Sequence, residues 1–173
     1  MTGHEIVDTI LVAGAALISV VELATGKASR LAAGALLVLV ALALLWGWGS
    51  DADHDLDKTV TVLAAVLAVA GGGLVTTQVF SFVEDPEGVT RAGSVLRGGA
   101  WIGALERLAV YVALVAGWAP GLAIVLAVKG LGRYPELRNQ EDTGVAERFI
   151  IGTFTSVLWA CGCAGVVLLV GQA

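Results

Sequence analysis

Charged, aromatic and proline residues are scarce in this chain, and so are cysteine and histidine. Charged residues make up 14% of the 173 residues and aromatic residues 6%, and the sequence holds 3 prolines, 2 cysteines and 2 histidines. The 10 Lys and Arg residues are outnumbered by 15 acidic residues, which gives a net charge of −5. A chain with so few basic residues offers no basic surface for a nucleic acid, so we predict no nucleic-acid partner.

The few cysteines and histidines leave little material for an active site. Cys161 and Cys163 are two positions apart in an apolar run, so on a helix their side chains point in different directions, and we interpret them as packing residues. His4 and His54 both fall outside the apolar runs. Because HExxH, GxSxG and Walker motifs are also absent, we predict neither an enzyme nor a bound metal or cofactor.

Part of the negative charge comes from one short segment in which aspartates alternate with other residues: Asp51, Asp53, Asp55 and Asp57. Such oxygen clusters suit hard cations. A calcium loop starting at Asp51 would need Gly at its sixth position and Glu at its twelfth, where the chain has Leu56 and Val62. We therefore interpret the segment as a solvated acidic loop, with a weak divalent-cation site as the alternative.

Hydrophobic residues are abundant, at 57% of the chain, and gather in long runs. The six runs cover Ile6–Ala24, Leu31–Trp48, Thr59–Phe80, Gly98–Trp118, Gly121–Leu131 and Val145–Val170. A membrane helix needs about 20 mainly apolar residues, and backbone groups in lipid must bond within their own helix. We therefore predict an all-α fold: a polytopic helical bundle with six transmembrane helices in the lipid bilayer. The first run follows acidic rather than basic residues, so we expect it to be retained and not removed as a signal peptide.

The basic residues are unevenly distributed between the connections. Three alternate connections carry nearly all of them: Lys27, Arg30, Arg91, Arg97, Arg133, Arg138 and Arg148. The opposite connections contain only Lys58. By the positive-inside rule, the basic side faces the cytoplasm and both termini lie outside the cell inner (plasma) membrane. Three tryptophans, which favour the interface, then fall on the outer side: Trp46, Trp48 and Trp118.

Many of the 23 glycines lie inside the apolar runs. Gly99 and Gly103 form a GxxxG pair, and Gly152 and Ser156 form a related pair. Small residues let helix backbones approach closely in a membrane, where the hydrophobic effect does not drive helix association. We interpret both pairs as helix-packing sites.

The third run contains three consecutive glycines followed by polar residues: Gly71, Gly72, Gly73, Thr76, Thr77 and Gln78. Each glycine weakens a helix by about 1 kcal/mol, so this stretch could kink or unwind. A tightly packed helix is the interpretation we favour, and a broken helix lining a cavity is the alternative.

An ionisable pair lies in the middle of the fourth run. Counting 1.5 Å per residue from Arg97 puts Glu106 and Arg107 about 14 to 15 Å from the inner edge, and counting from Pro120 puts Lys129 about 13 to 14 Å deep in the fifth run. Only Gly117–Gly121 separate the two runs, so they must form an antiparallel hairpin, and we predict a Glu106–Lys129 contact, direct or through water.

Adjacent residues on a helix diverge by about 100°, so Arg107 needs a partner of its own. We expect it to face one of these polar residues on another helix: Gln78, Thr153, Thr155 or Ser156. Arg133 and Glu147, near the membrane ends of their helices, extend the predicted buried charge network. The fifth run is short if it ends at Leu131, so either the helix continues to Leu137 or the bilayer thins there.

Residues 94–173 contain three motifs that follow one another in the chain. Gly98–Leu108 includes WIGALER, Gly121–Leu137 includes Lys129 followed by Arg133, and Ala146–Phe154 includes AERFIIGT. Together they resemble the C-terminal module of a family of bacterial integral membrane proteins with no assigned function, which has W-I-G-x-L-E-R, K-S-x-x-R-F and A-E-Y-F-L-I-G-T elements. This chain has Gly130 and Arg148 where the family has Ser and an aromatic residue. The resemblance singles out Glu106, Arg107, Lys129, Arg133, Glu136, Glu147, Gly152 and Thr153, without giving their role.

The chain divides into an apolar half, residues 1–80, and a charged half, residues 94–173, within a single membrane domain, residues 1–173. Each half has three predicted spans, so their topologies are inverted, as in some transporters. One hypothesis is a channel or transporter subunit in which the Glu, Arg and Lys residues line or gate a polar path. The other is a non-catalytic scaffold or assembly subunit, forming homo-oligomers or a small membrane complex, in which the charges only lock the bundle.

Overall fold

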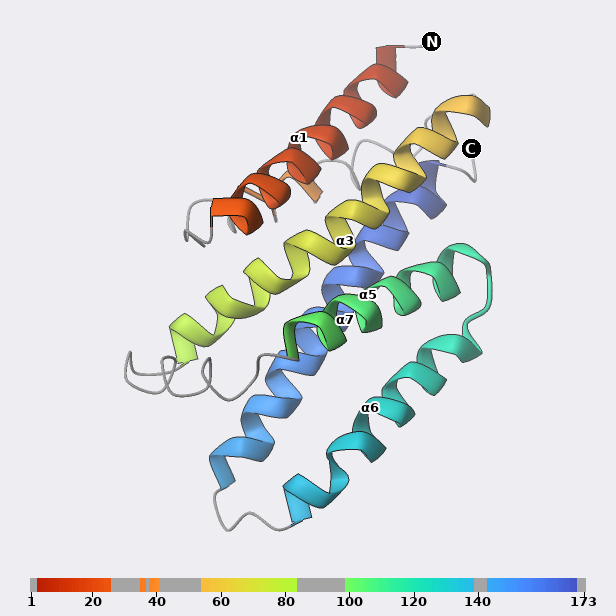
Figure 1. Ribbon diagram of the computed structural model, residues 1–173. Coiled ribbons are helices and arrows are strands. Elements are labelled where there is room, and N and C mark those ends of the chain that lie inside the picture. Colours follow the sequence, from red (N-terminus) through yellow and green to blue (C-terminus); the bar gives the residue numbers. More distant parts are fainter. Residues whose placement is uncertain are drawn as a thin grey trace.

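The computed structural model describes residues 3–25, 35, 36, 38–40, 54–83, 99–138 and 143–170. Nearly all of these residues are helical, and none of them lies in a strand. Five helices have defined bounds (Figure 1): α1 (Gly3–Thr25), α3 (His54–Val83), α5 (Gly99–Val115), α6 (Pro120–Arg138) and α7 (Thr143–Val170). The predicted all-α fold class is confirmed for this part of the chain.

Among the described residues, two helices are long and apolar enough to cross a membrane: residues Lys58–Phe82 of α3 and Ala146–Leu169 of α7. Shorter apolar stretches cover Thr9–Glu22 in α1 and Pro120–Gly132 in α6, and α5 has 17 residues. The predicted run Leu31–Trp48 falls largely outside the described residues. The six transmembrane spans therefore stay a prediction.

Helix α6 is longer than its apolar run. It continues past Leu131 to Arg138 as a single helix, which agrees with the alternative in which the fifth run extends through Leu137. The extension contains Gly132 and Pro135, which are both poor helix formers, so helix propensity does not account for its continuing beyond the apolar run.

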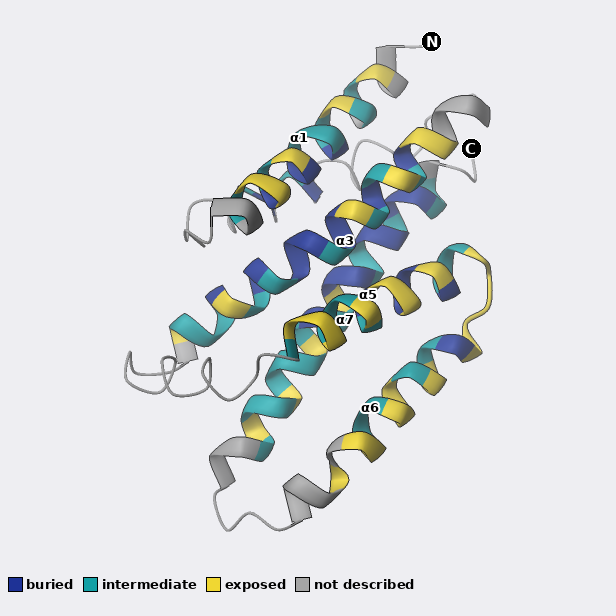
Figure 2. Cartoon of the chain, in the orientation of Figure 1, coloured by how far each residue is buried: buried dark blue, intermediate teal, exposed yellow. Residues whose placement is uncertain are grey.

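Helix α3 lies at the centre of the packing. It packs against α1, α5 and α7, while α5 also packs against α7 and α6. The core consists mainly of aliphatic residues, of which the largest fully buried are Leu36, Leu67, Val12, Val60, Val110 and Val166. Figure 2 shows that buried residues concentrate on α3 and its neighbours, whereas most of α6 is exposed or partly buried. The two predicted halves therefore meet along α3.

Two aromatic side chains tie neighbouring helices to the main chain of α3. Tyr111 Oη on α5 donates to the carbonyl oxygen of Thr61 at 2.6 Å, and Trp159 Nε1 on α7 donates to the carbonyl oxygen of Leu67 at 3.1 Å. A helical carbonyl oxygen accepts one bond within its helix, and its second lone pair is free for such a donor. Helix α3 thus accepts these two hydrogen bonds through its main chain and needs no polar side chain for them.

The turn between α5 and α6 forms the predicted antiparallel hairpin. Gly117 has a φ of 70°, its N–H donates to Leu114, and the N–H of Trp118 donates to the carbonyl of Ala113 at 2.8 Å. This pair of bonds around a left-handed glycine is a Schellman motif, which closes the carboxyl end of α5. Pro120 then begins α6, where its missing N–H costs nothing.

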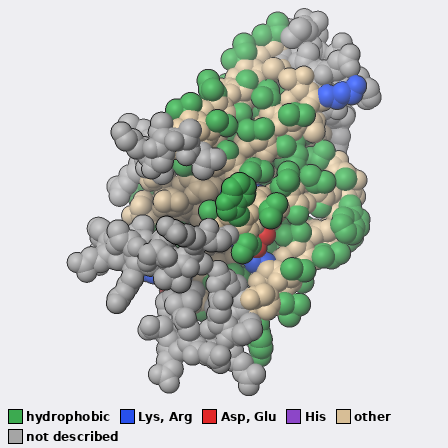
Figure 3. Space-filling view, in the orientation of Figure 1, with side chains coloured by type: hydrophobic (Ala, Val, Ile, Leu, Met, Phe, Trp, Pro, Cys, Tyr) green, Lys and Arg blue, Asp and Glu red, His purple; other side chains and the backbone are tan. Residues whose placement is uncertain are grey.

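Large apolar side chains lie exposed on every described helix. Examples on α5, α6 and α7 are Trp101, Leu105, Val128, Leu131, Phe154 and Leu158. Figure 3 shows one face of the molecule, whose described surface is mainly hydrophobic with few charged side chains. Apolar surface on this scale marks contact with lipid or with another protein.

Replacing Gly117 by Ala should destabilise the hairpin, because a side chain in the left-handed region costs about 1–2 kcal/mol. Thermal or denaturant unfolding in detergent micelles measures the loss. Gly130→Ala is the matched control, since Gly130 lies inside α6 with nothing within 4 Å of a Cβ atom built there. The control should gain up to about 1 kcal/mol in helix propensity. Equal effects of the two substitutions would contradict the role given to Gly117.

Candidate functional site

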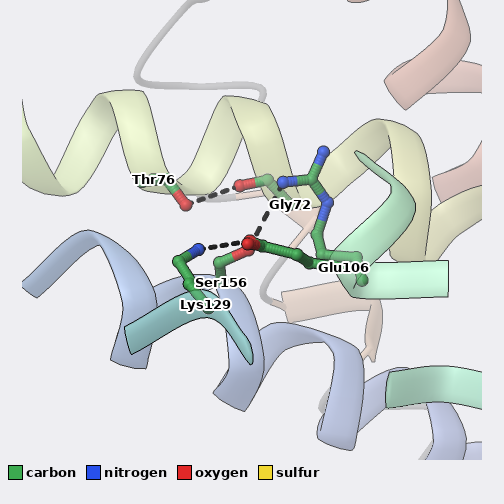
Figure 4. Close-up of polar contacts among 6 residues, drawn as sticks. Gly72, Thr76, Glu106, Lys129 and Ser156 are labelled. Carbon is green, nitrogen blue, oxygen red and sulfur yellow. Dashed lines mark hydrogen bonds and ion pairs between the residues drawn. The ribbon is translucent and has the colours of Figure 1, made fainter. Parts of the chain in front are cut away.

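Arg107 is the buried centre of a group of polar residues, of which Figure 4 labels Thr76, Glu106, Lys129 and Ser156. It lies on α5, is 8% exposed, and its guanidinium group bonds to α3 and α7. Its Nε and Nη2 atoms donate to the main-chain carbonyl oxygen of Val69 at 3.1 and 2.8 Å, and Nη1 donates to Ser156 Oγ at 3.3 Å. Among the described residues, all acceptors of Arg107 are neutral, so the guanidinium connects three helices through dipoles rather than through an ion pair.

Glycines on α3 make room for the side chains that reach it. A Cβ atom on Gly72 would lie 2.3 Å from Arg107 Cδ, and one on Gly71 would lie 2.7 Å from Trp159 Cζ2. Any residue larger than glycine at these two positions would displace the arginine or the tryptophan. A Cβ atom on Gly103, on Arg107's own helix, would lie 3.3 Å from Nη1, which is a tight contact but not a collision.

Helix α3 runs unbroken through Gly71, Gly72 and Gly73. The alternative of a broken helix lining a cavity is therefore wrong, and the favoured interpretation of a packed helix agrees with the structure. The hydroxyl groups of Thr76 and Thr77 donate back to the carbonyl oxygens of Gly72 and Gly73 at 2.7 and 2.9 Å. These bonds satisfy both threonine side chains within the helix.

Glu106 and Lys129 form the predicted direct contact. Lys129 Nζ on α6 donates to Glu106 Oε2 on α5, and it lies 6.0 Å from the centre of the Phe149 ring on α7. The side chains of Lys129 and Glu106 are 18% and 17% exposed, respectively. This ion pair is therefore less enclosed than Arg107 and lies where α5, α6 and α7 approach one another.

One of the four polar residues predicted as partners of Arg107 is bonded to it. Ser156 accepts the Nη1 bond, whereas Gln78 is buried near Ser81, whose Oγ lies 2.8 Å from the main-chain oxygen of Gln78. Thr153 Oγ1 is buried and has no hydrogen-bond partner among the described residues. The sequence identified the helix that meets Arg107 but did not distinguish Ser156 from its neighbours.

The other predicted members divide between packing and exposure. Gly152 packs closely against α3, because a Cβ atom there would lie 3.0 Å from the Phe80 ring, while Gly99 begins α5. Glu147 is exposed on α7, so its assignment to a buried network is wrong: it lies near the start of α7, where its side chain still faces outward. Arg133 is helical, but its side chain lies outside the described residues.

Three contacts of the site were missed by sequence reasoning. The Val69 carbonyl oxygen accepts two bonds from Arg107, but a main-chain acceptor has no sequence signature. Trp159 and Phe149 are ordinary apolar residues in a run where no polar pattern marks them. Within the described residues, no group of three or more His, Cys, Asp or Glu residues could hold a metal ion.

Comparison of the chain with protein families, with curated proteins and with solved structures finds no match. The resemblance carried by the motifs around Glu106, Lys129 and Glu147 therefore stays an expectation from the sequence.

Replacing Gly72 by Ala should destabilise the protein, because the new methyl group would collide with an arginine side chain that three hydrogen bonds hold in place. Overpacking and weakened bonds to the guanidinium outweigh the gain of about 1 kcal/mol in helix propensity, for a net loss of about 2 kcal/mol. Unfolding in detergent measures it. The matched control is Gly14→Ala on α1, where nothing lies within 4 Å and stability should hold or rise.

Proposed function

We propose that the protein is a multi-pass inner-membrane protein with six transmembrane helices and both termini outside. The six apolar runs, the one-sided distribution of Lys and Arg, and the exposed apolar side chains on every described helix support this proposal. In this arrangement, lipid would cover the exposed apolar side chains.

Within the membrane, we propose a non-catalytic scaffold or assembly subunit that works in homo-oligomers or a small membrane complex. The observation that carries this proposal is the way Arg107 is bonded: three of its N–H groups bind the Val69 carbonyl and Ser156, and Gly72 closes against its stem. An arginine used to attract a substrate would present its donors to a solvated path. A guanidinium held by main-chain and hydroxyl oxygens instead fixes the positions of three helices.

A channel or transporter subunit is the second candidate, and one observation favours it. The Glu106–Lys129 pair keeps about a sixth of its side-chain surface exposed, so it could open and expose two charges near the membrane centre. Intramembrane ion pairs of this kind line ion and proton pathways in other proteins. The unbroken α3 removes the bend that this hypothesis placed at Gly71–Gly73.

The topology can be tested with reporter fusions in a bacterial host. Alkaline phosphatase fused after Ala173 should be active and a fluorescent protein at the same position should be dark, because both termini lie outside in the proposed arrangement. Fusions truncated after Arg138 are the control and should give the reverse result, since this end of α6 is proposed to face the cytoplasm. A fluorescent fusion after Ala173 with inactive phosphatase would contradict the orientation.

A liposome flux assay with Glu106→Gln separates the two functions. A scaffold should give no flux above that of empty liposomes under potassium, chloride or proton gradients. The substitution should then only lower stability, by about 1–3 kcal/mol, between the values for exposed and buried ion pairs. Glu147→Gln is the matched control, because Glu147 is an exposed carboxylate on α7 and its loss should change stability little.

The opposite result would support transport. It would consist of selective flux through the unchanged protein that Glu106→Gln abolishes while the melting temperature stays the same. In that case the ion pair would take part in ion transport and would not serve mainly to hold α6 against α5.

A further inference from the structure

Several hydrogen-bond donors on α5, α6 and α7 have no acceptor among the described residues. A guanidinium has five N–H donors and an ammonium has three. Arg107 uses three of its donors and Lys129 uses one in hydrogen bonds to described acceptors. Thr153 adds a buried hydroxyl group that has no partner among the described residues. Buried polar groups are almost always satisfied, so the unused N–H groups of the buried Arg107 together with the unpartnered hydroxyl group of Thr153 indicate a bound species that completes them.

These groups lie along one stripe of α7. Phe149, Thr153 and Ser156 follow one another at spacings of four and three residues, so their side chains share a face of the helix. Phe149 contacts Lys129 at one end of this stripe, and Ser156 contacts Arg107 at the other. Along α7, Thr153 therefore lies between the residue that contacts Lys129 and the residue that contacts Arg107.

The charge of this group is not balanced among the described residues. Arg107 and Lys129 contribute two positive charges, Glu106 contributes one negative charge, and Arg107 has no carboxylate at salt-bridge distance in the described part of the chain. A buried cation without a counter-ion is costly in a low-dielectric interior. One further negative charge would complete the group.

We propose that Thr153, Arg107 and Lys129 bind a small monovalent anion of the chloride class between α5, α6 and α7. The site supplies donors and a net positive charge, which exclude a cation. A single negative charge neutralises the group, whereas a divalent anion would reverse its sign. The anion would be a structural component of the bundle, so this proposal goes beyond the scaffold function and does not depend on transport.

The test compares the melting temperature of the purified protein in sodium chloride and in sodium gluconate at equal ionic strength. An anion that binds only the folded state raises the melting temperature by about 2–4 °C at about five times its dissociation constant, for a chain of this size. We expect this rise in chloride and in bromide, and no rise in gluconate.

Thr153→Val identifies the site, because valine keeps the shape of threonine and removes the hydroxyl group. The variant should lose the chloride-dependent rise. In gluconate it should be at least as stable as the unchanged protein, since a buried hydroxyl without a partner has been removed. Thr155→Val is the matched control: Thr155 lies two residues further along α7, on another face, and this variant should keep the rise.

Two outcomes would overturn the proposal. An equal chloride response in all three proteins would mean that chloride acts elsewhere or through general salt effects. An equal loss of stability of Thr153→Val in both salts would mean that the hydroxyl group holds a water molecule only. Neither outcome depends on the flux assay, so the anion site and the scaffold function can fail separately.

Discussion

The bonding of Arg107 to the main chain of α3 is the constraint on which the arrangement of the helices depends. A guanidinium stays charged at any physiological pH, so once buried it must find acceptors inside the protein. The Val69 carbonyl oxygen provides them, and it can be reached only because Gly72 leaves space for the stem of the arginine. Moving α5 along or away from α3 would break these bonds, and the Ser156 bond extends the same constraint to α7.

Glu106, the residue before Arg107 on α5, contacts a different helix. Because consecutive residues diverge by about 100°, Arg107 faces α3 and α7 while Glu106 faces Lys129 on α6. Helix α6 packs mainly against α5, so the hairpin at Gly117 and this ion pair determine much of its position. Two adjacent residues thus divide the bundle into a tightly bonded centre and a more exposed outer helix.

Part of the candidate site could be predicted from the sequence, and part of it could not. Depth counting brought Glu106 and Lys129 together because a short turn joins the two helices, and rise per residue is nearly constant. The main-chain acceptor at Val69 could not be predicted, because every residue has the same carbonyl group. Glu147 was assigned to the buried network from its place in the chain, but exposure depends on which way a helix is rotated against its neighbours. A lone sequence gives that rotation poorly when a run is apolar all round.

Polar contacts from α5 and α7 converge on the main chain of α3. If lipid surrounds the bundle, burying apolar side chains between helices gains little, and close packing and hydrogen bonds must hold the helices together. Tyr111, Arg107 and Trp159 donate to the carbonyl oxygens of residues 61, 69 and 67 of α3. A helix that contributes only its backbone to these bonds can remain apolar along its length. Helix α3 is thus long and apolar enough to cross a membrane, and its main chain still provides acceptors for the side chains of α5 and α7.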